Sequence, residues 1–264
     1  MKRSTKRRLR HASLYIVLIA ALLALLFGLD WKAVQQTFFN SDGFKHNWHD
    51  LIVTGAKNTA IYTVIAFVGG LALAIVLALM KLSEVGPYRW LATAYIEFFR
   101  GLPALITILM MGFGVPIAFH WHPPGGTAGA GLIGLVLVAG AYMAETLRAG
   151  IQAVPKGQAE ASRSLGMSPA KTMGWIVLPQ AFRIIIPPLT NEFVLLIKDT
   201  SLLSIIGATV GSRELTNVAR DMLTSGPSAG TSTSLVMAGL LYLVITLPLT
   251  QLVAWLERRQ RRAR

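Results

Sequence analysis

The sequence predicts an all-α integral membrane protein with about six spans, and three observations support this fold class. Of the 264 residues, 53% are hydrophobic and 14% are charged, a composition too apolar for a soluble domain. Several apolar runs approach the roughly 20 residues that a helix needs to cross the hydrocarbon core of a bilayer. The net charge is +13, and the basic residues gather at the two ends of the chain. Each basic cluster adjoins an apolar run, which is typical of cytoplasmic flanks, and nothing around them indicates a nucleic-acid partner.

The first predicted span is residues 14–29, which follow a basic stretch as a signal peptide would. Because the run continues to an interface-like Asp30, we expect an uncleaved span, with cleavage as the alternative. The third span is interrupted by Gly101 and Pro103, and the fifth by the polar letters KDTS. The five spans expected after the first are 56–80, 91–119, 129–147, 180–206 and 235–256.

The charges of the connecting segments predict the orientation. Segments 81–89 and 148–171 carry more basic than acidic residues, whereas 114–128 has no formal charge. Cytoplasmic loops carry the excess of lysine and arginine. We therefore expect both termini, and the polar region near residue 160, to be cytoplasmic.

That polar region reads as a short helix, a turn and the start of a second helix. Pro155 suits the first turn of a helix, and Gly166 suits the left-handed position that ends many helices. Ser168 and Pro169 then cap and begin the next helix, which Pro179 is expected to interrupt. The residues of the short helix whose spacings place them on one face are Glu160, Arg163 and Ser164.

The pattern Glu-Ala-Ser, three residues, Gly, nine residues, Ile-x-Leu-Pro runs from Glu160 to Pro179. It resembles the EAA loop of the membrane subunits of binding-protein-dependent ABC importers. The neighbouring stretches "YIEFFRGLPAL" (95–105), "YMAETLRAGI" (142–151) and the run 178–207 resemble the polar amino-acid branch of that family, the histidine, glutamine, arginine and cystine type. Two departures, Ser162 for the family's frequent alanine and Leu102 for its common threonine, add neither bulk nor charge to the short helix.

The resemblance implies a helical bundle like the transmembrane domain of a type I ABC importer. The permease domain would be 51–256, with its coupling loop at 150–179. Residues 1–50 would add a basic arm, an extra first span and an outer loop, and 257–264 a basic tail. The family's coupling helix docks on a separate ATPase, and the residues of this sequence that match its motif are Glu160, Ala161, Ser162, Arg163 and Gly166.

The resemblance also implies the function and the partners. The chain would move polar amino acids across the cytoplasmic membrane by alternating access, within membrane lipid. It would pair with a second permease chain, an ATPase dimer that binds ATP and Mg, and an external solute-binding protein. The sequence has no G-x-x-x-x-G-K-[ST] pattern, so we expect it neither to bind nucleotide nor to act as an enzyme. The particular amino acid stays open.

Charged residues within spans are costly and therefore informative. Glu97 and Arg100 lie three residues apart in the third span, as do Glu145 and Arg148 at the end of the fourth. Each pair is expected either to form an ion pair at the cytoplasmic interface or to take part in a gate.

The fifth span carries the residues expected to line the substrate pathway. Broken helices of transporters supply polar groups to a water-lined cavity, and we expect a stripe of Asn191, Leu195 and Lys198 to face it. Glu192 would lie nearer a helix contact. Alternatively, Lys198 and Asp199 neutralise each other at the outer interface. The candidate pathway residues are Asn191, Lys198, Asp199, Thr200 and Ser201.

Two other function classes compete with this reading. An ion-coupled secondary carrier would need its own coupling acid near the midplane and usually inverted repeats, and neither is evident. A membrane scaffold or sensor would not need a charged, broken fifth span. Two histidine pairs, one in "HNWHD" and one in "HWH", are incomplete as metal sites, so no metal is expected.

Overall fold

The structure, a computed structural model, describes residues 3–262 and is helical, with no strand among those residues. Residues 1, 2, 263 and 264 of the basic ends lie outside the described residues. Within this described part of the chain, five helices are long and apolar enough to cross a membrane, or six if a bent pair counts as one span. The predicted all-α membrane fold with about six spans is therefore confirmed.

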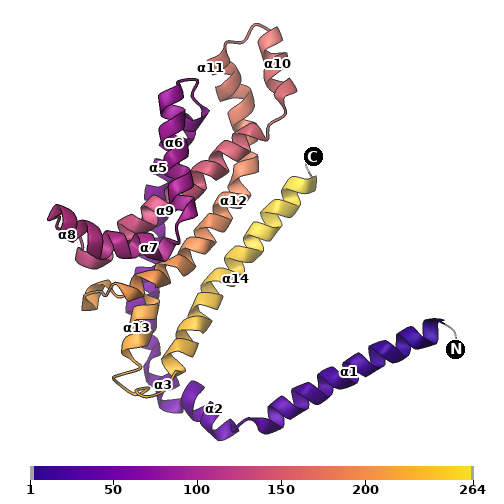
Figure 1. Cartoon of the computed structure of the whole chain (residues 1–264), viewed down its shortest axis with the longest axis vertical. Helices are drawn as coiled ribbons and strands as arrows, with labels where there is room; N and C mark the ends of the chain where they lie inside the picture. Colours follow the sequence, from indigo (N-terminus) through magenta and orange to yellow (C-terminus); the bar gives the residue numbers. More distant parts are fainter. Residues whose placement is uncertain (1–2, 263–264) are drawn as a thin grey trace.

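The first helix, α1 (Arg3–Gly28), extends away from the rest of the molecule (Figure 1), and none of the described side chains in its span 11–28 is buried. It is followed by α2 (Trp31–Phe38), α3 (Ser41–His46), α4 (Trp48–Asp50), a π-helical turn (Leu51–Ala56) and α5 (Lys57–Leu82). Next come α6 (Gly86–Gly101), α7 (Ala104–Leu109), a second π-helical turn (Met110–Gly114), α8 (Val115–Phe119) and α9 (Gly126–Gln152). The remaining elements are α10 (Lys156–Ser164), α11 (Pro169–Lys171), a third π-helical turn (Thr172–Val177), α12 (Leu178–Asp199), 3₁₀ turns at Thr200–Ile205 and Val210–Ser212, α13 (Leu215–Asp221) and α14 (Thr233–Arg262).

The third predicted span is not straight. α6 and the helical stretch from α7 to α8 meet at an angle of 103°. Leu102 and Pro103 between them are extended, because a proline pushes the residue before it out of the helical region. The sequence placed the interruption correctly but did not reveal the sharp bend.

The fifth span begins earlier than predicted, and Pro179 does not interrupt it. Helical structure continues from Pro169 to Ile205. The π-helical turn Thr172–Val177 lies just before Pro179. We attribute the tolerance of Pro179 to this wider turn, which relaxes the usual clash of a proline ring with the carbonyl four residues before it.

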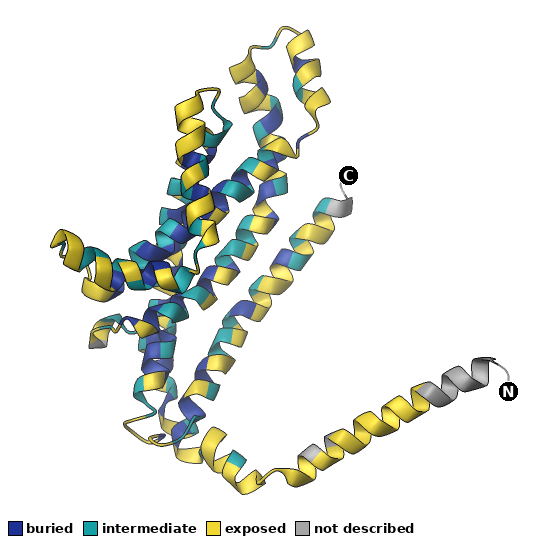
Figure 2. Ribbon diagram, viewed as in Figure 1, coloured by how far each residue is buried: buried dark blue, intermediate teal, exposed yellow. Residues whose placement is uncertain are grey.

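The centre of the bundle is α9, which packs against α5, α6, α7 and α12. Of its most apolar window 61% is buried, compared with 17% for α14 (Figure 2). Small residues allow the close approach. A Cβ on Gly70 of α5 would lie 2.9 Å from the Cβ of Ala139, and one on Gly131 would lie 2.2 Å from Ile206. A larger residue at either glycine would therefore collide with the neighbouring segment.

A buried carboxylate ties together the helices at the end of the bundle opposite α10. Glu214, which has no exposed surface, accepts hydrogen bonds from the backbone N–H groups of Thr216 (2.8 Å) and Asn217 (2.6 Å). It also accepts one from the hydroxyl of Tyr242 on α14 (2.9 Å). These bonds cap α13 and attach it to α14, a role that the sequence did not suggest.

Candidate functional site

The polar region forms a short helix, α10, at one end of the bundle (Figure 1). Pro155 occupies its N-cap position. At the other end, Gly166 has a φ of 81°. Its N–H donates to the carbonyl of Arg163 (3.0 Å), and the N–H of Met167 donates to that of Ser162 (3.2 Å). This is the Schellman arrangement of a helix C-terminus, so the predicted start and end of the short helix are confirmed.

Ser162 faces inward, unlike its neighbours in the motif. It is buried, and its hydroxyl donates to the hydroxyl of Thr172 (2.9 Å) and to the carbonyl of Ala159 (2.9 Å). Ala159 itself packs against the main core. Ser162 therefore holds α10 against the start of the fifth span and is not part of its outer surface.

The outer surface of α10 carries Glu160, Ala161 and Arg163, which are all exposed. The guanidinium of Arg163 donates to the carbonyl of Met167 (2.9 Å) and so braces the turn that follows the helix. Leu165, at the end of the helix, is 84% exposed. Sequence reasoning missed Leu165, although a leucine within a polar loop is a usable signal, because an exposed apolar group on a rigid element is typical of a docking surface.

An ionic cluster lies at the same end of the bundle. The carboxylate of Glu145 accepts hydrogen bonds from Nζ of Lys81 (3.1 Å) and from Nε of Arg148 (3.0 Å), and it makes a second contact with the Arg148 guanidinium. All three side chains are at most a quarter exposed. Because Lys81 lies in the last turn of α5 and Glu145 belongs to α9, the cluster joins these two helices.

Glu97 and Arg100 of α6 interact with neighbouring helices. The carboxylate of Glu97 lies 3.9 Å from Nζ of Lys81. The guanidinium of Arg100 lies 5.7 Å from the ring centre of Tyr142 on α9. Spacing along the sequence identified the pairs Glu97–Arg100 and Glu145–Arg148 as candidates. It did not identify Lys81, because local spacing carries no information about a neighbouring helix.

On α12, the residues of the predicted stripe form one exposed face. Asn191, Leu195 and Lys198 are exposed at successive helical turns, whereas Glu192 is half-buried. Asp199 is also half-buried and ends α12, and the 3₁₀ turn that follows is the predicted break.

The hydroxyl residues after Asp199 differ in their availability. Thr200 is fully buried and donates to the carbonyl of Ile197 (2.7 Å), so this conformation does not offer its hydroxyl to a ligand. Ser201 is partly exposed. Within residues 3–262, no group of three histidine or acidic side chains is arranged to hold a metal ion.

These features agree with comparisons to known proteins. Residues 70–262 match the family described as the binding-protein-dependent transport system inner membrane component. The chain belongs to this family. The resemblance read from its EAA-like loop is confirmed, and the membrane permeases of this family are multi-pass inner membrane proteins.

Similar permeases occur in Bacillus subtilis strain 168. The probable glutamine ABC transporter permease protein GlnM is 36% identical over 214 residues, which cover 79% of this chain and 93% of the relative. The L-cystine transport system permease protein TcyB is 38% identical over 182 residues, covering 69% of this chain and 72% of the relative. The arginine transport system permease protein ArtQ is 34% identical over 219 residues, which cover 79% of this chain and 91% of the relative.

Solved structures confirm the type I importer fold. The crystal structure of an amino acid ABC transporter with histidines superposes with a TM-score of 0.72 at 36% identity, covering 80% of this chain and 95% of the other. The inward-facing MetNI methionine ABC transporter gives a TM-score of 0.56 at 18% identity, covering 82% and 95%. At 18% identity the second match supports the fold alone.

Proposed function

We propose that this permease imports polar amino acids, driven by a separate ATPase that docks on α10. The single observation that carries the proposal is the connection of α10 to α12. α10 is short, exposed and capped at both ends, and the Ser162–Thr172 hydrogen bond joins it to the helical stretch that continues into α12. The exposed stripe with Lys198 lies near the far end of that stretch. A displacement of α10 is therefore transmitted directly to the helix that carries the stripe.

The proposed orientation places both termini and α10 in the cytoplasm, where an ATPase and its ATP are present. The basic residues of the segments around α6 and α10 support this placement. A solute-binding protein would deliver substrate at the opposite end of the bundle, near α13. A second permease chain would complete the pathway, since the stripe on α12 is exposed in the single chain.

Polar amino acids fit the charges of the pathway and the names of the relatives. Lys198 offers a cation for a carboxylate, and the adjacent Asp199 offers an anion for an ammonium group. A substrate bearing both charges would therefore pair with both residues. The relatives are named for glutamine, cystine and arginine, which supports the class without selecting one member.

ATP would act through the two α10 helices of a permease pair. Closure of the ATPase dimer would draw them together and rock the bundles from inward-open to outward-open. Within one subunit, the bonds of Glu145 to Lys81 and Arg148 would keep α5 and α9 moving as a unit. We assign the cluster to this structural frame rather than to the gate.

Single cysteines test the docking, because the chain contains no cysteine of its own. Glu160→Cys and Leu165→Cys, both on the exposed surface, should each form a cross-link with the ATPase in the assembled complex. Ser162→Cys is the matched control, because this position is buried against Thr172. Absence of cross-links at 160 and 165 in a complex that still co-purifies would contradict docking on α10.

A further inference from the structure

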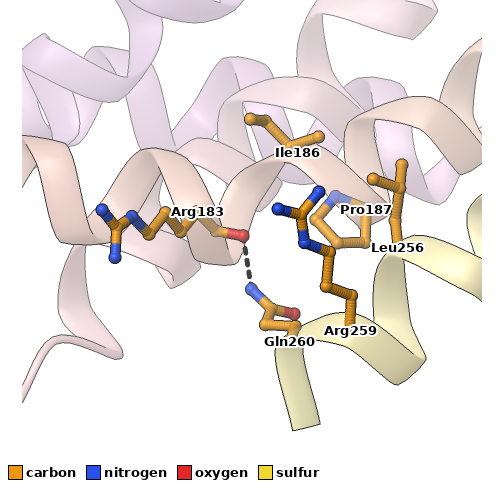
Figure 3. Close-up of a pocket in the computed structure, with 6 residues that line it drawn as sticks. All are labelled: Arg183, Ile186, Pro187, Leu256, Arg259 and Gln260. Carbon is orange, nitrogen blue, oxygen red and sulfur yellow. Dashed lines mark hydrogen bonds between the residues drawn. The ribbon is translucent and has the colours of Figure 1, made fainter. Parts of the chain in front are cut away.

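A pocket of about 460 Å³ lies between α12 and α14, and Pro187 in its wall lies one helical turn before Asn191, the first residue of the stripe. It sits where α14 runs into the basic tail, and none of the roles proposed so far uses it. Figure 3 shows the residues that line it, which come from both helices. They are Arg183, Ile186, Pro187, Leu256, Arg259 and Gln260.

The backbone chemistry of α12 fixes one wall of this pocket. Pro187 has no N–H, so the carbonyl of Arg183, four residues before it, loses its helical partner. The side-chain amide of Gln260 donates a hydrogen bond to that carbonyl (Figure 3). α14 is therefore attached to α12 at the proline, and the pocket has a defined edge.

The charge of the pocket is positive. The guanidinium of Arg259 lies beside Pro187 and Ile186 (Figure 3), 5.4 Å from the ring centre of Trp255. Arg183 also lines the pocket, but its guanidinium points away from Arg259 (Figure 3), and no acidic residue is among the lining residues. A tryptophan and arginines at the end of an apolar helix are typical of the membrane interface.

The walls of the pocket are apolar and continue into exposed apolar surface. Ile186 and Leu256 line it, and Ile186 and the nearby Leu252 are both more than 40% exposed. A positive group above apolar walls at the membrane interface complements a lipid that has a negative headgroup and acyl chains. A small soluble anion would leave the apolar walls unused.

We propose that this pocket binds an anionic phospholipid, with Arg259 contacting the phosphate and Ile186 and Leu256 contacting an acyl chain. The inference rests on the proposed function only for the leaflet, which would be the cytoplasmic one. The lipid would lie against the proline of α12 and the Gln260 bond, where it could stabilise the junction of α12 with α14.

The thermal unfolding midpoint of the full-length chain in detergent measures binding as lipid is added. Phosphatidylglycerol should raise the midpoint at lower concentration than phosphatidylcholine with the same acyl chains. Arg259→Gln should raise the half-maximal phosphatidylglycerol concentration about fivefold, the value expected for one arginine near a lipid surface. Arg258→Gln is the matched control, because this substitution removes the same charge. Arg258 donates to the carbonyl of Ala254 and does not line the pocket.

A second variant changes the shape of the pocket and leaves its charge unchanged. Ile186→Trp fills the apolar wall and should weaken phosphatidylglycerol binding while both arginines remain. Equal effects of Arg259→Gln and Arg258→Gln would overturn the proposal, because binding would then follow the overall charge of the tail. Competition by millimolar inorganic phosphate would also overturn it, in favour of a site for a soluble anion. The assay contains no ATPase, so its outcome is independent of docking on α10.

Discussion

Replacing Gly166 by valine tests whether the shape of α10 matters for coupling. Gly166 has a φ of 81°, and no atom lies within 4 Å of a Cβ built there. The valine therefore meets no neighbour, and its cost arises from the backbone alone. A left-handed residue with a Cβ costs about 1–2 kcal/mol, which is about a 5–30-fold change in the equilibrium between the formed and the frayed helix end. A nine-residue helix has little stability of its own to offset that cost.

The assay is a titration of the permease, reconstituted in lipid nanodiscs, with the purified ATPase subunit. Gly166→Val should raise the ATPase concentration that gives half-maximal stimulated hydrolysis about 5–30-fold, since docking must first restore the helix end. Gly174→Val is the matched control. Gly174 is also exposed with nothing within 4 Å, but it does not have the left-handed conformation.

Two results would refute this reasoning. The first is an unchanged half-maximal concentration for Gly166→Val in a well-folded, monodisperse preparation. The second is an equal loss in Gly174→Val, which would show that any bulk near the loop disturbs docking.

Three further changes probe the frame and the pathway. Glu145→Gln should lower the free energy of unfolding by about 1.5–3 kcal/mol, because it weakens charged hydrogen bonds to Lys81 and Arg148; denaturant unfolding with a Lys81→Gln double-mutant cycle measures this. Lys198→Gln should reduce substrate transport while basal ATP hydrolysis and assembly stay normal. Equal transport by variant and wild type would exclude a substrate contact at Lys198. Glu214→Gln should destabilise the chain by about 1–3 kcal/mol, because its amide cannot accept all three bonds that the carboxylate accepts; an unchanged melting temperature would speak against that role.

The local features of the site were predictable from the sequence because they depend on a few neighbouring residues. A proline at a helix start and a glycine at its end act through their own backbone angles, so the ends of α10 followed from Pro155 and Gly166. Helical periodicity likewise placed Asn191, Leu195 and Lys198 on one face. The polar residues KDTS (198–201) marked the change from α-helix to 3₁₀ turn.

Features that depend on distant segments could not be predicted. The inward orientation of Ser162 is set by Thr172, and the partner of Glu145 on another helix is Lys81, 64 residues earlier. The effect of Pro179 depends on the π-helical turn before it. Propensity rules treat a proline as a helix breaker and do not anticipate such a turn.

The most direct test of the central claim is uptake into proteoliposomes that contain the permease. Radiolabelled glutamine, arginine and cystine would be supplied with the binding protein outside and ATP inside, with and without the ATPase subunit. The account predicts uptake of at least one of these amino acids only when the ATPase and ATP are both present, and its loss when α10 carries Gly166→Val. Uptake without the ATPase, driven by an imposed ion gradient, would contradict it and identify the chain as a secondary carrier.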